Sequence, residues 1–280
     1  MRYRLALMLL CASLWFAAPS QAANVPRLNQ AWESLLGAQL IFLYYGVGTL
    51  GDLYKNKIYT SPQVLRYLGM LEPTLRQEQL FLSQIKPLGA AKNREMFRRI
   101  RAVVDFLVQE ASTLRRFVNE GKEEDWSQFV TYRRAAVEDI QYVLTHQAVR
   151  SSRSFRGGSK AAYRHLGHYL GVDLVFGYFF VGLVADGYFR LLLPADQTRQ
   201  HLGLTARLLN NNIQQLARAK HSIPKEDRAR VLSIAQGMAT LAETAKALDT
   251  FAASRQRDAL KKYWLLRKRT WSYVRILSDG

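Results

Sequence analysis

Two carboxylates occupy corresponding places in two long apolar segments, and their type and spacing are the most suggestive of chemistry. Asp52 follows a stripe of apolar residues at helical spacing, and Asp186 follows a similar stripe 134 residues later. A carboxylate at the end of an apolar stripe must find a cation or hydrogen-bond donors, or become protonated. Each Asp is therefore predicted either to lock two helices together through Arg or Tyr, or to face a shared cavity.

In the cavity alternative, aromatic side chains near the two carboxylates line a site for a small or hydrophobic ligand. The candidate ligand-binding residues are Tyr45, Asp52, Tyr54, Phe179, Asp186 and Tyr188. A further alternative makes Asp52 and Asp186 a catalytic pair. No catalytic motif accompanies them, so the sequence predicts a protein that is not an enzyme and has no catalytic residues.

Metal and phosphate chemistry is weakly represented. His165 and His168 lie three residues apart and can share a helix face, but a metal site needs further ligands, and Asp173 is out of phase with them. Gly157-Gly158-Ser159-Lys160 lacks the preceding strand and the first glycine of a phosphate-binding loop. The sequence therefore predicts no metal site and no cofactor.

The elements that position these residues are predicted to be helices in two copies. LGAQLIFLYY at 36–45 returns as LGVDLVFGYF at 170–179, and the same register pairs Gly48 with Gly182 and Lys86 with Lys220. Helical periodicity, Pro and Gly signals predict helices near 24–59, 61–86, 93–119, 124–146, 161–193, 196–219, 222–254 and 255–277. No segment alternates like a strand. The predicted fold is all-α, an internally duplicated four-helix unit forming an eight-helix bundle with pseudo-two-fold symmetry.

The first helix of each copy is apolar on nearly every face over 36–50 and 170–185, which is typical of a buried helix. We therefore expect Phe42, Tyr45, Phe176 and Phe179 to be inaccessible to solvent. A transmembrane helix is the rival interpretation, but Asp173 and Asp186 bracket only twelve residues, and a span needs about 20. The predicted organisation is a first repeat at 23–148, a basic Gly- and Ser-containing linker at 149–160, and a second repeat at 161–280.

The N-terminal segment at 1–22 has the pattern of a secretory signal. Arg2 and Arg4 precede an apolar run, and Ser20-Gln21-Ala22 supplies a small-residue cleavage site. Cleavage after Ala22 predicts a periplasmic or secreted protein, and an uncleaved anchor is the alternative. Because the single Cys lies at position 11, the mature chain then has no disulfide.

The charge balance points to an anionic partner. The chain has 40 Lys and Arg against 22 Asp and Glu, a formal net charge of +18. In an envelope such a charge favours an anionic membrane surface, an envelope polymer or an acidic protein, and nucleic acid is not expected there. The bland alternative is a background of solvated Lys and Arg.

Two segments concentrate this charge, the linker and the last helix. The candidate docking residues are Arg150, Arg153, Arg156, Lys160, Lys261, Lys268 and Arg275. Trp264 and Trp271 repeat at seven beside the last three, a combination that suits peripheral association with a membrane interface. The alternative places Trp264, Trp271 and Val274 in the core.

These observations favour an exported, non-enzymatic binding or scaffold protein whose basic face docks on an anionic envelope partner. The alternative is a periplasmic sensor or carrier that holds a small or hydrophobic ligand between the two central aromatic-rich helices.

Overall fold

The structure of this chain, a computed structural model, describes residues 25–84, 91–150, 160–219 and 225–279. Within these ranges the backbone forms eight α-helices and one short 3-10 helix, and it contains no strand. The predicted all-α class is therefore confirmed for the described part of the chain. The predicted signal peptide at 1–22 lies outside the described residues.

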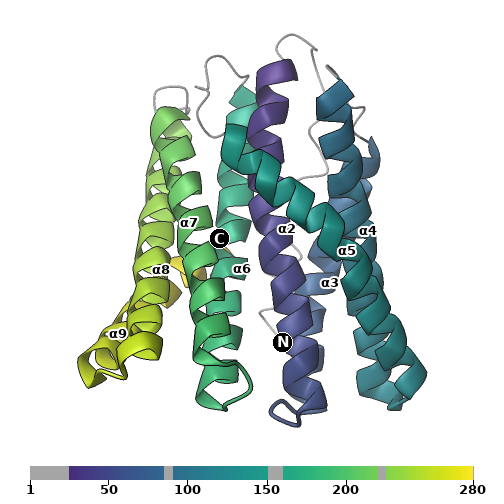
Figure 1. Ribbon diagram of the computed structural model, residues 1–280. Helices are drawn as coiled ribbons and strands as arrows, with labels where there is room; N and C mark the ends of the chain where they lie inside the picture. The colour runs from purple at the N-terminus through teal and green to yellow at the C-terminus, as the bar shows by residue number, and fades with distance from the viewer. Residues whose placement is uncertain (1–24, 85–90, 151–159, 220–224, 280) are drawn as a thin grey trace. The chain divides into compact units, whose positions relative to one another are not determined.

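The helices follow the predicted order (Figure 1), and most of their ends fall within about one turn of the prediction. The helices are α2 (Val25–Lys55), α3 (Ser61–Gln84), α4 (Ala91–Glu120), α5 (Glu123–Arg150), α6 (Lys160–Phe189), α7 (Ala195–Ala219), α8 (Arg228–Ser254) and α9 (Arg257–Asp279). The 3-10 helix η2 (Lys225–Asp227) precedes α8. The predicted restart at 222–224 and most of the predicted linker lie outside the described residues.

Contacts divide the chain into two units, which are described separately. The first, called the α3–α5 unit, comprises Leu36–Ser152 and Gly182–Leu193, so it includes α3, α4, α5, most of α2 and the last turns of α6. The second, called the α7–α9 unit, includes α7, α8 and α9, the part of α6 up to Val181 and the start of α2. The helices α2 and α6 therefore each contribute to both units.

In the α3–α5 unit, α4 packs against both α3 and α5 (Figure 1). Its buried residues Ile100, Val103, Leu107 and Leu114 are spaced three, four and seven apart, which places them on one face of the helix. An apolar stripe of this kind must be covered by neighbouring helices, and this need drives the packing of the unit.

The α7–α9 unit follows the same rule. Here α8 packs against both α7 and α9. Its buried residues Ile234, Met238, Leu241, Ala245 and Leu248 alternate in steps of four and three. Because this helix presents one apolar stripe between two neighbours, it forms the centre of its unit.

The long apolar segments of α2 and α6 are buried as predicted. Every residue from 39 to 53 is buried except Tyr45 and Asp52, and most residues from 170 to 188 are buried. Phe42 is 2 % exposed and Phe176 is 7 % exposed, which confirms their prediction. The prediction is wrong for Tyr45 and Phe179, which are half-buried. Tyr45 lies two turns before Asp52 on one helix face, and that face borders a partly solvated ion pair.

One described stretch, Leu170–Phe189, is long and apolar enough to cross a membrane, with a mean hydropathy of 1.6. Of its most apolar window, 78 % is buried inside the protein. The core helix of a globular protein has the same properties, so this stretch is weak support for a membrane span.

The helix α2 ends earlier than the predicted position near Tyr59. Lys57 adopts a left-handed backbone with φ 60°, which terminates the helix although the residue is not glycine. The amide of Ile58 donates to the carbonyl of Leu53 at 2.9 Å, and the amide of Lys57 donates to that of Tyr54 at 2.9 Å. These two bonds form a Schellman motif, which satisfies carbonyls at the helix end.

The helix α6 also ends earlier than predicted, and it ends with the same motif. Leu191 has φ 62°, and its amide donates to the carbonyl of Tyr188 at 3.1 Å. The amide of Leu192 donates to the carbonyl of Gly187 at 2.8 Å. A non-glycine residue in the left-handed region carries no recognisable signal in the sequence, so both ends were missed.

Candidate functional site

Asp52 is held by an arginine that the sequence did not single out. Arg133 on α5 donates from Nη1 to both carboxylate oxygens of Asp52 on α2, at 3.0 and 2.9 Å. The Asp52 side chain is 34 % exposed and that of Arg133 is 28 % exposed. The guanidinium lies on Gly48, where a Cβ would be only 2.6 Å from its Nε. Glycine at this position therefore makes room for the ion pair.

Beneath this pair lies a carboxyl group that has no hydrogen-bond partner. Glu110 on α4 is fully buried, and neither of its carboxyl oxygens forms a hydrogen bond. Burial raises the pKa of Glu110 well above its ordinary value, Arg133 opposes this rise, and Asp52 adds to it. Glu110 is therefore held neutral in the core. Its position three residues after Leu107, on the apolar face of α4, was a signal that could have identified it.

Two tyrosines of α2 complete this polar cluster. Burial raises the pKa of Tyr44 and of Tyr45, and in both cases the positive charge of Arg133 opposes the rise. The two rings contact each other edge to face, with centroids 5.1 Å apart. The cluster thus joins one ion pair, one neutral acid and two neutral phenols, an arrangement suited to holding helices together.

The second carboxylate has a different partner. In the α3–α5 unit, the hydroxyl of Tyr59 donates a short hydrogen bond to Oδ2 of Asp186 on α6. Burial, followed by this hydrogen bond, raises the pKa of Tyr59. The Tyr59 ring also stacks on Tyr67, with centroids 5.8 Å apart. Both carboxylates of the predicted pair are thus engaged by donors from other segments of the chain.

Asp52→Asn and Asp186→Asn are expected to differ in their effect on stability. Asp52→Asn leaves the charge of Arg133 unpaired, and because the pair is about a third exposed the loss should be about 1–2 kcal/mol. Asp186→Asn keeps an acceptor oxygen for Tyr59, so its loss should stay below about 1 kcal/mol. Urea denaturation at neutral pH measures both. A larger loss for Asp186→Asn would contradict this assignment of partners.

The other candidate ligand-binding residues do not converge on one place. The hydroxyl of Tyr54 donates to the carbonyl of Val118 at 3.4 Å, and Tyr188 is buried at 2 % exposure. Tyr45, Tyr54 and Tyr188 belong to the α3–α5 unit, whereas Phe179 belongs to the α7–α9 unit.

A buried carboxyl–amide pair crosses between α2 and α3. Nε2 of Gln39 donates to Oε1 of Glu78 at 2.9 Å. Burial raises the pKa of Glu78 to about 8, and the hydrogen bond from Gln39 opposes this. Gln39 Oε1 and Glu78 Oε2 have no partner in the structure. A proton on Glu78 Oε2 would give this amide oxygen a donor, so a neutral Glu78 suits the pair.

The α7–α9 unit contains a pair of the same kind between α6 and α7. Nδ2 of Asn212 donates to Oδ2 of Asp173 at 2.8 Å, and both side chains are buried. Among the described residues, no three His, Cys, Asp or Glu side chains lie close enough to hold a metal ion. The side chains of His165 and His168 are outside the described set.

The outer face of α9 carries exposed side chains of two kinds. Lys261, Lys268 and Arg275 are exposed, as predicted for docking residues. Four large apolar side chains are exposed beside them: Trp264 at 51 %, Leu265 at 69 %, Trp271 at 40 % and Ile276 at 61 %. The alternative that placed both tryptophans in the core is therefore wrong, although it is correct for Val274, which is 2 % exposed.

The core-facing side of α9 explains this outcome. Its buried residues are Tyr263, Thr270, Val274 and Leu277, which form one stripe at helical spacing. Trp264 and Trp271 lie at the edge of the opposite face. Trp271 contacts Tyr178 of α6 on one side, with ring centroids 5.4 Å apart, and remains partly exposed.

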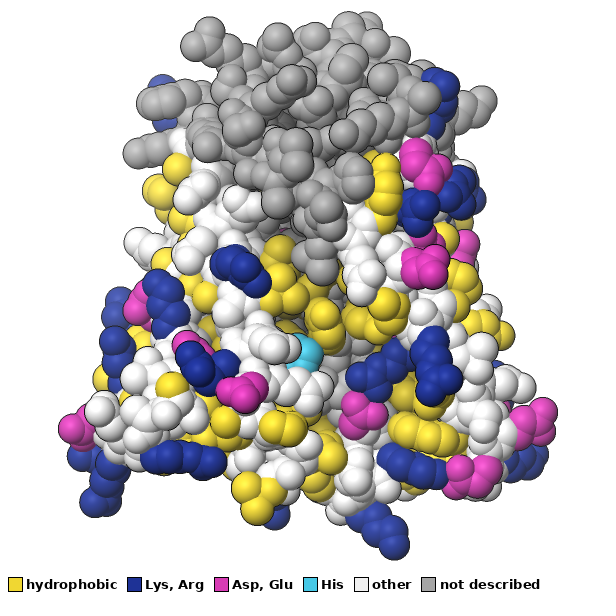
Figure 2. Space-filling view, viewed as in Figure 1, with side chains coloured by type: hydrophobic (Ala, Val, Ile, Leu, Met, Phe, Trp, Pro, Cys, Tyr) yellow, Lys and Arg dark blue, Asp and Glu magenta, His cyan; other side chains and the backbone are white. Residues whose placement is uncertain are grey.

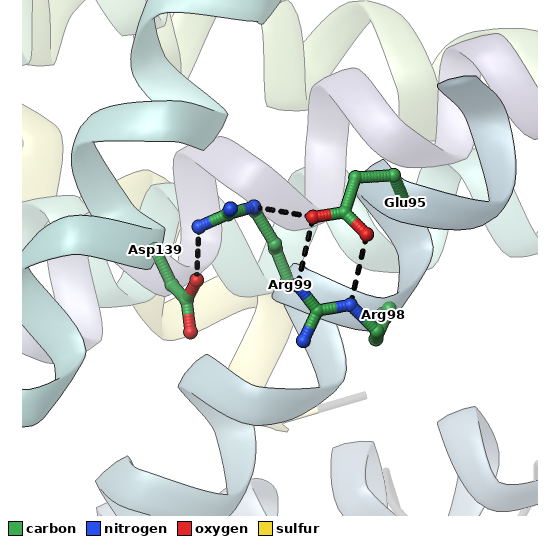
Figure 3. Close-up of polar contacts among 4 residues, drawn as sticks. All are labelled: Glu95, Arg98, Arg99 and Asp139. Atoms are coloured by element: carbon green, nitrogen blue, oxygen red, sulfur yellow. Dashed lines mark hydrogen bonds and ion pairs between the residues drawn. The ribbon is translucent and has the colours of Figure 1, made fainter. Parts of the chain in front are cut away.

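Basic side chains elsewhere are largely balanced by acids. Figure 2 shows one face of the molecule on which Lys and Arg side chains are interspersed with Asp and Glu side chains. On α4 and α5, Glu95 pairs with Arg98 and Arg99, and Arg99 also binds Asp139 at 2.7 Å (Figure 3). The hydrogen bond from Arg98 is the main cause that lowers the pKa of Glu95 to about 2.

The basic residues of α9 are balanced less. Lys261 pairs with Asp258 at 3.2 Å. Within the described part of the chain, no carboxylate forms an ion pair with Lys262, Lys268 or Arg269. The face therefore keeps a net positive charge next to its exposed apolar groups.

The predicted docking residues of the linker are not placed. Arg153 and Arg156 lie outside the described residues. Arg150 and Lys160 are the last residue of α5 and the first of α6, and their side chains are outside the described set.

The chain was also compared with known proteins. No protein-family model, no curated protein and no solved structure matches it.

Proposed function

We propose that this protein is an exported, non-enzymatic binding protein that docks on an anionic partner of the cell envelope through the outer face of α9. The observation that carries the proposal is the combination of exposed Lys and Arg with exposed Trp, Leu and Ile on one helix face. A soluble protein with no partner at this face would expose these large apolar side chains without gain. Export rests on the signal pattern at 1–22.

The positive charge of this face would draw an anionic partner to it. A local concentration of one sign of charge produces a field that steers association, whereas dispersed charge mainly aids solubility. The attraction between exposed charges is screened over about 8 Å at physiological salt. Binding that depends on this face should therefore weaken as salt concentration rises.

We also propose that the chain arose by duplication of a four-helix unit. Features of the two halves recur at the register of 134 residues found in the sequence. The left-handed residues Lys57 and Leu191 share it, and so do Gly121 and Arg255, which end α4 and α8. The carboxyl–amide pairs Gln39–Glu78 and Asp173–Asn212 also share it, with the carboxyl moved from the second helix to the first. These recurrences support a common origin.

Binding of the mature chain to anionic vesicles is expected to be strong at low salt and to fall steeply at moderate salt. Replacing Lys261, Lys268 and Arg275 by Gln should weaken it at least about tenfold, because three charges leave the face. Stability should change little, since exposed charges contribute little to it. Co-sedimentation with phosphatidylglycerol and phosphatidylcholine vesicles at two salt concentrations measures the effect.

A matched control removes the same charge elsewhere. Lys225, Arg228 and Arg230 are exposed near the start of α8, and their replacement by Gln lowers the net charge by the same amount. This control variant should bind nearly as well as the unmodified chain. Equal losses for both triple variants would show that total charge, and not the face of α9, determines binding.

A further inference from the structure

The exposed side chains of α9 are arranged in parallel lines. On a helix of 3.6 residues per turn, Lys261, Lys268 and Arg275 form a central line, because they recur every seven residues. Trp264 and Trp271 lie along one side of this line, and Leu265 and Ile276 lie along the other. From Trp264 to Ile276 the face extends about 18 Å along the helix.

The fold itself does not require these side chains. At the 134-residue register, α5 is the counterpart of α9, and it is also the last helix of its half. Where α9 has Trp264 and Trp271, α5 has Val130 and Val137, both half-buried. Where α9 has Lys261 and Arg275, α5 has Ser127 and Gln141. A helix in this place can thus be built without tryptophans or a basic line, so a further role accounts for them on α9.

We infer that the partner of this face is the surface of an anionic phospholipid bilayer, with α9 lying parallel to the membrane plane. This inference rests on the proposed function and names its partner. Lys and Arg contact the phosphates of the headgroups, and Trp, Leu and Ile enter the boundary between headgroups and acyl chains. Interfacial helices combine these two contributions, and tryptophan prefers that depth.

The other partners fit only part of the face. An anionic polymer neutralises the basic line but offers no apolar phase for four large side chains. A second copy of the chain covers the apolar side chains but brings Lys and Arg against the same charges. A bilayer with anionic headgroups satisfies both groups at once, which is why it is favoured.

The other side of α9 fixes the orientation of this face. Tyr263, Thr270 and Val274 are buried against the rest of the α7–α9 unit, and Tyr263 is 0 % exposed. The guanidinium of Arg267 lies over the ring of Tyr178 at 4.7 Å, and Trp271 contacts the same ring. The helix therefore cannot roll, so the basic line and its flanking apolar groups face outward together.

Tryptophan fluorescence with brominated lipids tests the inference on the mature chain. Vesicles contain phosphatidylglycerol together with phosphatidylcholine brominated on its acyl chains, and bromine quenches only tryptophans that enter the bilayer. Trp126 packs against Phe117 and Phe129 in the α3–α5 unit, so it serves as an internal reference that should stay unquenched. We expect marked quenching for the unmodified chain.

Trp264→Val with Trp271→Val is the decisive variant, since valine is the residue that α5 uses at these positions. We expect this variant to stay folded by circular dichroism, to lose the quenching, and to bind the anionic vesicles at least about tenfold more weakly. Salt-sensitive binding of the unmodified chain without quenching overturns the inference and leaves docking on an anionic partner intact. Quenching that persists in the variant also overturns it. Absence of binding to these vesicles refutes the lipid partner, and binding to a soluble polyanion then decides whether the proposed function survives.

Discussion

Replacing Phe129 by Ala is expected to lower the free energy of unfolding by about 3–5 kcal/mol, one of the two largest effects in this protein. Phe129 on α5 is 0 % exposed and stacks on Trp126, with ring centroids 4.9 Å apart. The tip of its ring lies against Gly51 of α2, where a Cβ would be 2.4 Å from Cζ. The ring therefore joins α5 to the buried helix α2, and its removal leaves a cavity. Urea denaturation followed by circular dichroism measures the loss.

Glycine substitutions on α2 test the same contact from the other side. Gly51→Ala forces a methyl group onto the ring of Phe129, which should cost about 1–3 kcal/mol. Gly46→Ala on the same helix is the matched control, because its Cβ would meet nothing within 4 Å, and Ala favours a helix by up to about 1 kcal/mol over Gly. Combining Gly51→Ala with Phe129→Leu should recover part of the loss. Additive losses in the double variant would contradict direct contact.

Glu78→Gln is expected to stabilise the protein at high pH, by an amount of several kcal/mol, and to have little effect near pH 5. The folded pKa of Glu78 is raised from 4.5 to about 8, so the unfolded chain releases this proton at lower pH than the folded chain. Between those values unfolding releases a proton. Through this group, stability therefore falls as pH rises from about 4.5 to 8, by up to about 1.4 kcal/mol per pH unit. Glutamine does not titrate, so the variant lacks this loss.

Urea denaturation of both proteins at pH 5, 7 and 9 measures the difference. Glu243→Gln is the matched control, because Glu243 is an exposed carboxylate in a surface pair with Lys246. The gap between Glu78→Gln and the unmodified chain should widen from pH 5 to pH 9, and the control should show no such trend. A gap that is constant with pH would mean that Glu78 is ionised in the folded protein.

The sequence determined the features that depend on local periodicity. Apolar residues spaced three and four apart predicted the helices, because a helix with one apolar stripe must bury it. Gly121 correctly predicted the end of α4, since it takes the left-handed φ of 70° that ends a helix. The spacing of seven between Lys261, Lys268 and Arg275 placed them on one face of α9. Each of these inferences needs only residues within a few turns of one another.

The tertiary structure alone decided which groups meet. Asp52 and Asp186 occupy equivalent places, yet Asp52 binds Arg133 and Asp186 binds Tyr59. These partners lie 81 and 127 residues away along the chain, and no local pattern selects them. Similarly, the spacing of Trp264 and Trp271 was compatible with either a core or a surface position. The choice depended on which side of α9 its neighbours cover, because a helix fixes the angles between its own side chains but not the direction in which the packed helices turn it.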